Sequence, residues 1–188
     1  IDLSVGSILS LSAIFTALCM KQNIPVWLAI LVGLLSGILM GLINGALIHF
    51  TGINAFIITL GTSFLYRGLA LIVTRGTPVS KLPAAYRAFG GGDIFQVESG
   101  VYMALLVLLL SIPLLYKMRW GHYITTLGGN PVALRRCGVR TGAWRISTFA
   151  VMGFLAALAG IIISARLNSA EPNAGLNMEM DAITAVIL

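Results

Sequence analysis

Long apolar runs dominate the chain and determine its predicted fold. Residues 3–20, 22–66, 99–116 and 146–165 contain no Asp, Glu, Lys or Arg. A helix needs about 20 apolar residues to cross a hydrocarbon core about 30 Å thick. The run 22–66 is long enough for two such helices, and the alternation typical of barrel strands is absent. The pattern therefore predicts an all-α, polytopic bundle of transmembrane helices.

Two tight turns, at 21–25 and 49–53, help to divide these runs into separate helices. We expect about five full transmembrane helices and the start of another, at 3–20, 26–48, 54–74, 99–116, 146–165 and from near 182. Residue 1 is Ile, and Leu188 lies within an apolar run. We therefore expect residues 1–188 to be a single transmembrane domain that is truncated at both ends.

Composition indicates that the bilayer is the solvent of this chain. Of its residues 58% are hydrophobic and 10% are charged, whereas a soluble domain carries about 25% charged residues. The net charge of +6 does not indicate nucleic-acid binding, because the basic residues flank the apolar runs. Basic loops between transmembrane helices stay in the cytoplasm. We accordingly place loop 117–145 there, since it has basic but no acidic residues: Lys117, Arg119, Arg135, Arg136, Arg140 and Arg145.

Small residues recur at helical spacing in two of the predicted helices. Helices in lipid associate by close backbone approach at such faces, because lipid tails are as apolar as leucine. The pattern predicts helix packing in a conduit-forming bundle or, equally, in a tightly packed bundle of any other purpose. The packing residues are Gly33, Gly37, Gly41 and Gly45, then Gly153 with Ala157, and Gly160 with Ala156.

A short helix is predicted at about 131–137, within the basic loop. Asn130 is a good N-cap, Pro131 suits the first helical position, and Gly138 suits the residue after the helix. Arg135 and Arg136 fall in the last turn, where cations oppose the negative end of the helix dipole. A helix of about seven residues, roughly 10 Å long, needs a surface to lie on. It is therefore either a knob for a cytoplasmic partner or an ordinary basic loop against the membrane.

Several polar residues lie within the apolar runs. Serine and threonine can hydrogen-bond to their own helix, so local satisfaction is an alternative to a functional role. Arg67 is a stronger signal because intramembrane charge is costly, although it could also extend to the interface near Thr74. The candidates for a translocation path or gate are Asp2, Ser4, Asn44, Thr59, Arg67 and Asp181.

Asp2 and Asp181 each open an apolar run, and the two nine-residue stretches around them share three identical positions. Five predicted crossings lie between them, so we expect them at opposite membrane faces, with the polar stretch 166–181 outside. This is the arrangement of an inverted-topology repeat, and transport sites often lie where such repeats meet. Two ordinary helix-start aspartates would give the same pattern.

Enzymatic chemistry is not predicted. Cys19 and Cys137 suggest no disulfide framework, and His49 and His122 stand apart, so we expect neither a cofactor nor a metal site. No nucleophile–base constellation or phosphate loop is present in the sequence. If transport is active, the energy must come from an ion gradient or from another subunit.

Several stretches resemble the permease family of ABC importers for ribose, xylose, galactose and related sugars, which is related to the branched-chain amino-acid permeases. They occur in family order and span nearly the whole chain. Thr184 departs from the alanine that is usual in the family. The matching stretches are Ile1–Ser7, Phe56–Thr62 with Tyr66–Ala70, Gly121–Tyr123 with Gly128–Pro131, and Gly153–Arg166 continuing through Ser169–Pro172 to Met180–Ile183.

The resemblance implies an importer fold with two inverted halves in the bacterial cytoplasmic membrane. It also implies a second permease copy, ATPase subunits on the cytoplasmic side, where ATP would be hydrolysed, and an external solute-binding protein. In such importers a short cytoplasmic helix couples the ATPase to the permease. The stretch that matches it contains Gly129, Asn130, Pro131, Arg135, Arg136 and Gly138.

Two other classes of function stay open on the residues alone. An ion-coupled secondary transporter or passive solute channel would use Asp2, Asp181 or Arg67 as a coupling or gating charge. A non-transporting membrane scaffold would need only the packing faces.

Overall fold

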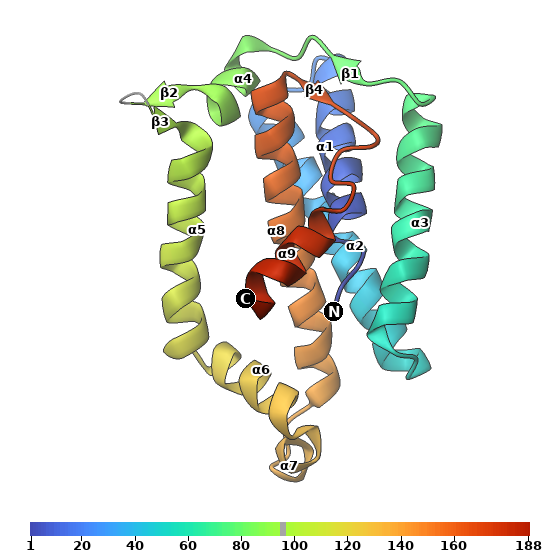
Figure 1. Ribbon diagram of the computed structural model, residues 1–188, viewed down its shortest axis with the longest axis vertical. Coiled ribbons are helices and arrows are strands. Elements are labelled where there is room, and N and C mark those ends of the chain that lie inside the picture. Colours follow the sequence, from blue (N-terminus) through green and yellow to red (C-terminus); the bar gives the residue numbers. More distant parts are fainter. Residues whose placement is uncertain (95–96) are drawn as a thin grey trace.

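The computed structural model describes residues 1–94 and 97–188, and helices form most of it (Figure 1). The described helices are α1 (Val5–Lys21), α2 (Val26–Thr51), α3 (Ala55–Thr74), α4 (Ala84–Gly91), α5 (Ser99–Tyr116), α6 (Arg119–Gly129), α7 (Pro131–Arg136), α8 (Thr141–Leu167) and α9 (Met178–Ile187). Among the described residues, four helices are long and apolar enough to cross a membrane: α2, α3, α5 and α8. The first predicted crossing, α1, is apolar but has 17 residues. The prediction of a polytopic helical bundle is confirmed.

Helices α1, α2 and α8 form the centre of the bundle, and small residues allow them to lie close together (Figure 1). A Cβ on Gly37 would meet the backbone of Gly153, and one on Gly153 would meet that of Gly37. At Gly160 a Cβ would meet the backbone of Leu9 in α1. The remaining predicted packing residues lie in the same contacts: Gly33 against Thr16, Gly41 against Phe149, Gly45 against Ile146, and Ala157 fully buried beside Gly37.

The outer helices bury much less of their surface. Helix α5 stands to one side of the bundle and presents a leucine-rich surface (Figure 1). Helix α3 packs along α1 and buries one side that includes Thr59, Thr62 and Tyr66. The exposed apolar faces of these helices suit contact with lipid, because lipid tails are as apolar as leucine side chains.

One end of the bundle carries short strands and α4, and the other carries α6 and α7 (Figure 1). Strand β1 (Val79–Ser80) pairs antiparallel with β4 (Ser169–Ala170), and β2 (Asp93–Ile94) pairs with β3 (Val97–Glu98). The Tyr86 hydroxyl joins α4 to α8, since it lies 3.0 Å from the Ile161 carbonyl and 2.6 Å from Ser164 Oγ. Burial raises the pKa of Tyr86 to about 12.

The structure departs from the sequence prediction at several boundaries. Helices α4 and α6 were not predicted, and α8 begins at Thr141 rather than near 146. These segments mix polar and apolar residues, so a search for charge-free runs misses them. Helices α4 and α6 lie at opposite ends of the bundle (Figure 1), where polar side chains can reach water.

The stretch after β4 does not stay at the end of the bundle, as expected, but turns inward along α1 (Figure 1). It is not helical until α9 begins at Met178, and Gly175 and Asn177 have φ angles of +73° and +65°. We call residues 171–177 the inward segment. As a result α9 and both chain termini lie at the middle of the bundle's height. The expectation that Asp2 and Asp181 mark opposite faces is therefore wrong, because the inward segment brings α9 back to the start of α1.

Candidate functional site

A chain of polar side chains, all buried except the half-buried Asp2, links three helices near the start of α1. The Asp2 carboxylate accepts hydrogen bonds at Oδ1 from the Ser4 amide (2.9 Å) and the Ser4 hydroxyl (2.6 Å). Asn44 Nδ2 on α2 donates to Ser4 Oγ over 2.7 Å. The Tyr66 hydroxyl on α3 lies 3.2 Å from Asn44 Oδ1 and 3.1 Å from the Met40 carbonyl. We call this set, together with Thr59, the polar centre.

Thr59 of α3 completes the polar centre by bonding to the backbone just before α1 begins. Its Oγ1 accepts a hydrogen bond from the Leu3 amide over 3.1 Å and donates to the Ala55 carbonyl over 2.8 Å. Asp2 Oδ2 is buried and has no hydrogen-bond partner among the described residues. A buried polar atom without a partner is costly, so this oxygen is suited to a ligand or to a further part of the protein.

Arg67 holds the inward segment against α3. Its Nη1 donates to the Pro172 carbonyl and to the Ala174 carbonyl, both over 2.7 Å. From the other side, the Ser10 hydroxyl of α1 lies 2.9 Å from the carbonyls of Glu171 and Pro172. Non-helical backbone at membrane depth needs such partners, because lipid offers none. The Arg67 guanidinium therefore satisfies backbone carbonyls of the inward segment.

The inward segment also lies directly against the backbone of α1. A Cβ on Gly6 would meet the Gly175 carbonyl and the Glu179 carboxylate, and one on Gly175 would meet the backbone of Gly6. Glu179 and Asp2 both line a cavity of about 330 Å³ between the start of α1, α8 and α9. Two carboxylates and an unwound backbone thus lie beside one another in the middle of the bundle.

The polar centre brings together four of the six predicted path residues. Asp2, Ser4, Asn44 and Thr59 are hydrogen-bonded within it, and Arg67 follows its member Tyr66. Asp181 is not part of it, since it is exposed in the first turn of α9. Three further residues of this region are not among the predicted path residues: Tyr66, Ser10 and Glu179. The one available signal was a hydroxyl or carboxylate inside or beside an apolar run.

A second region lies at the α7 end of the molecule. Helix α7 begins where the Asn130 side chain accepts a hydrogen bond from the Ala133 amide over 3.0 Å. Leu134 is buried and anchors the helix, whereas Arg135 and Arg136 are exposed. Gly138 has a φ of +79° and follows the helix without a close neighbour at its Cβ position. Gly129 is the exposed last residue of α6, so the helix stands out as a short, basic projection.

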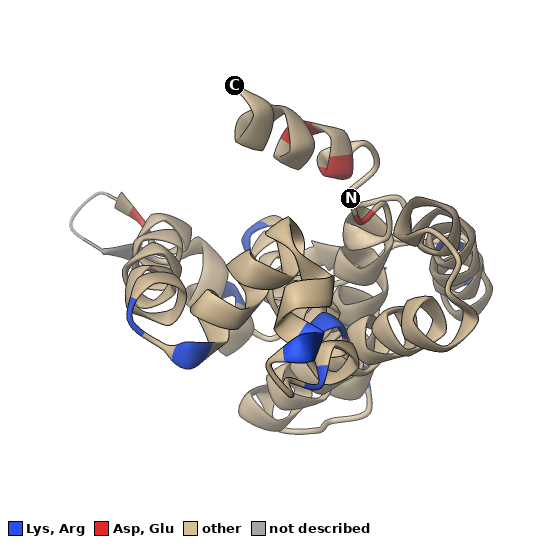
Figure 2. Ribbon diagram, turned by 90° about the horizontal axis from the view of Figure 1, so that it is seen from below, with Lys and Arg blue, Asp and Glu red and all other residues tan. Residues whose placement is uncertain are grey.

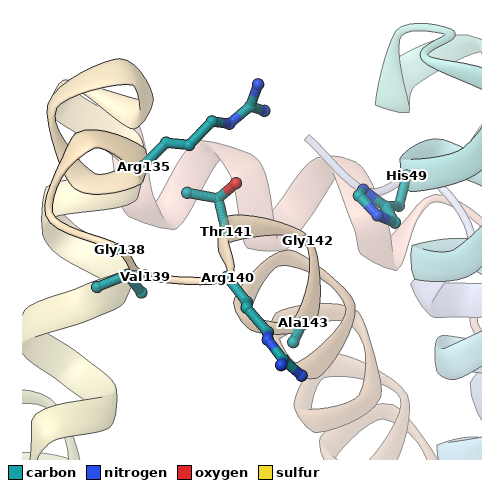
Figure 3. A pocket seen from close by; sticks show the side chains of 8 residues that line it. All are labelled: His49, Arg135, Gly138, Val139, Arg140, Thr141, Gly142 and Ala143. Atoms are coloured by element: carbon teal, nitrogen blue, oxygen red, sulfur yellow. The ribbon is translucent and has the colours of Figure 1, made fainter.

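Basic residues gather at this end, as the view from below shows (Figure 2). The acidic residues visible in that view lie in α9, beside the N-terminus and near β2. Between α7 and α2 a cavity of about 550 Å³ is lined by His49, Arg135 and Arg140 (Figure 3). The His49 ring lies where a Cβ on Gly142 would be, so the start of α8 packs closely against the end of α2.

A known protein family matches the whole length of the chain. Residues 1–188 match the family described as branched-chain amino acid transport system, permease component. The chain belongs to this family. With four membrane-length helices among its described residues, this family member is a multi-pass protein of the bacterial inner membrane.

Individual relatives of this permease-family chain are bacterial import permeases. The ribose import permease protein RbsC of Haemophilus influenzae is 37% identical over 192 residues, covering 100% of this chain and 59% of the relative. The D-allose transport system permease protein AlsC of Escherichia coli is 36% identical, covering 100% and 58%. The autoinducer 2 import system permease protein LsrC of Yersinia enterocolitica is 34% identical, covering 100% and 52%. The chain thus spans little more than half the length of these relatives. No solved structure matches it.

Proposed function

We propose that this chain is the membrane-spanning part of a permease subunit in an ATP-driven ABC importer for a monosaccharide or similar small polar solute. Its membership of the permease family over all 188 residues carries the proposal. The relatives' printed functions, import of ribose, allose and autoinducer 2, indicate the class of solute. In this proposal ATP is hydrolysed by a separate subunit.

The middle of the bundle supplies the translocation path in this proposal. Transporters place solute sites near the bilayer midplane, where helices are interrupted and backbone groups line a cavity. The inward segment interrupts the chain between α8 and α9 at that depth. Asp2, Ser4, Asn44 and Thr59 bring polar groups to the same level, and Arg67 fixes the interrupted backbone.

The α7 end supplies the contact with the ATPase subunits. Loop 117–145 is basic and free of acidic residues, which favours the cytoplasmic side. Helix α7 is capped, anchored through Leu134, and presents Arg135 and Arg136 outward. Such a helix can receive a push from a partner and pass it to α6 and α8, which it contacts. A solute-binding protein would dock at the opposite end, and a second permease copy would pair with this one within the bilayer.

Uptake by the full-length protein tests this proposal. The permease is reconstituted in vesicles with its ATPase and binding protein, and accumulation of D-ribose and D-allose is measured with and without ATP. We expect accumulation that requires ATP hydrolysis and withstands a protonophore. Accumulation that continues without the ATPase and collapses with the protonophore would instead indicate an ion-coupled transporter. ATP-independent equilibration would indicate a passive channel, and no solute-dependent behaviour a scaffold.

A further inference from the structure

A small cavity lies between the middle of α3 and the start of α9. Its volume is about 250 Å³, and its polar lining consists of Ser63, Arg67, Asn177 and Glu179. At 1.5 Å per residue, Ser63 and Arg67 lie about 12 and 18 Å along α3 from Ala55, in a helix about 30 Å long. The cavity is therefore at the depth where the bilayer is least polar. Polar groups at such depth are costly and usually functional.

The walls of this cavity are held in place by contacts already described. Arg67 is fixed by its two hydrogen bonds from Nη1 to the inward segment. The same segment ends at Asn177 and leads into Glu179 of α9, and its position is limited by the close approach of Gly175 to Gly6. The polar groups are thus presented on fixed backbone, which reduces the entropy cost of binding.

The polar groups that line the cavity retain hydrogen-bonding capacity. Nε and Nη2 of Arg67 and the side chains of Ser63, Asn177 and Glu179 form no hydrogen bond with any other described residue. Together they offer guanidinium and amide donors, carboxylate and amide acceptors, and a hydroxyl that does both. Phe64, which is 72% exposed, adds an aromatic surface.

We propose that this cavity, between Arg67 of α3 and Glu179 of α9, is a binding site for an uncharged, hydroxyl-rich solute of about monosaccharide size. One positive and one negative group line it, so an anion would face Glu179 and a cation would face Arg67. Hydroxyl groups satisfy both charges without adding another. The volume is below the range of about 300–1,000 Å³ that is typical for drug-sized ligands, which fits a smaller molecule. The inference deepens the proposed function and rests on it, since it names residues of the solute path.

Protection of an engineered cysteine tests the site in the full-length permease. Ser63→Cys is introduced into a protein whose own cysteines, Cys19 and Cys137 among them, are replaced by alanine. A hydrophilic methanethiosulfonate reagent is applied with D-ribose, D-allose, mannitol or gluconate. We expect Ser63→Cys to react, and an uncharged probe at about ten times its dissociation constant to slow labelling about tenfold. Gluconate should protect much less.

Two control variants separate the site from general effects. Gly61→Cys lies on the same helix in open space, so any labelling there should be unchanged by the probes. Glu179→Gln removes the negative group and should shift protection towards gluconate. A cysteine at 63 that does not react, or that no probe protects, would overturn the proposal, and protection by gluconate alone would overturn the solute class. Labelling needs no ATPase, so these outcomes are distinct from a failure of ATP-driven uptake.

Discussion

The polar centre and the α7 end use the same residue types in opposite ways. In the centre, Asn44 is fully buried and its side chain bonds two other helices, whereas Asn130 is exposed and caps the helix that follows it. Arg67 donates to two carbonyls of a distant segment. Arg135 makes no ion pair or side-chain hydrogen bond with the described part of the chain.

This difference indicates which region the fold depends on and which is available to another molecule. A buried side chain that hydrogen-bonds to other helices helps to fix the positions of those helices. An exposed cation without an internal partner contributes little to stability, because it is already well solvated. Matched substitutions in the two regions should therefore have unequal effects on the stability of the full-length protein.

The largest difference is expected between Arg67→Met and Arg135→Met. Loss of Arg67 leaves the Ala174 carbonyl at membrane depth without its partner and the Pro172 carbonyl with the Ser10 hydroxyl alone, and each charged hydrogen bond contributes about 1.5–3 kcal/mol. We expect a much lower melting temperature and poor accumulation in the membrane for Arg67→Met, but wild-type values for Arg135→Met. Thermal unfolding in detergent measures this, and equal melting temperatures for the two variants would contradict the comparison.

A second pair compares glycines. Gly37→Val places its side chain against the Gly153 backbone and Ala157, whereas Gly129→Val at the end of α6 enters open space. Overpacking of a close contact typically costs about 1–3 kcal/mol. We expect Gly37→Val to lower the melting temperature clearly and Gly129→Val to change it little. If both variants have the same melting temperature, the packing of α2 against α8 does not depend on the glycine contact.

The smallest difference is expected between the asparagines. Asn44→Ala leaves Ser4 and Tyr66 without their shared partner, at a cost of about 1–3 kcal/mol. Asn130→Ala removes an N-cap, at about 1 kcal/mol, and this cost is confined to the short helix α7. Hydrogen exchange separates the two: protection should fall at α1 and α3 for Asn44→Ala but only around α7 for Asn130→Ala. Loss confined to α2 in the first variant would argue against a link between the helices.

The membrane-length helices could be predicted from the sequence because each charge-free run carries its own signal. The short helix after Asn130 is also readable, since cap, first-turn proline and terminal glycine act within nine residues. Such signals need no knowledge of distant contacts. Helices α4 and α6 were missed because their residues are mixed in polarity, and their positions at the ends of the bundle decide their structure.

The inward segment could not be predicted in the same way. Its course depends on hydrogen bonds from Arg67 to residues 105 and 107 positions away, and on the close approach of Gly6 to Gly175. Counting membrane crossings assumes that each connection ends at a membrane face, and here one does not. A separate contact between helices, from the Tyr66 hydroxyl to Asn44 Oδ1, brings Tyr66 into the polar centre, and Tyr66 was not among the predicted path residues.

Charge reversal at α7 tests most directly the claim that this end binds the ATPase subunits while the polar centre belongs to the translocation path. Arg135→Glu with Arg136→Glu is made in the full-length permease, and Lys81→Glu with Arg87→Glu reverses two exposed charges at the opposite end as the control. Co-purification of the ATPase subunits and membrane insertion are then measured. We expect the α7 variant to insert normally but lose the ATPase, and the control to retain it. An α7 variant that keeps its ATPase would contradict this account.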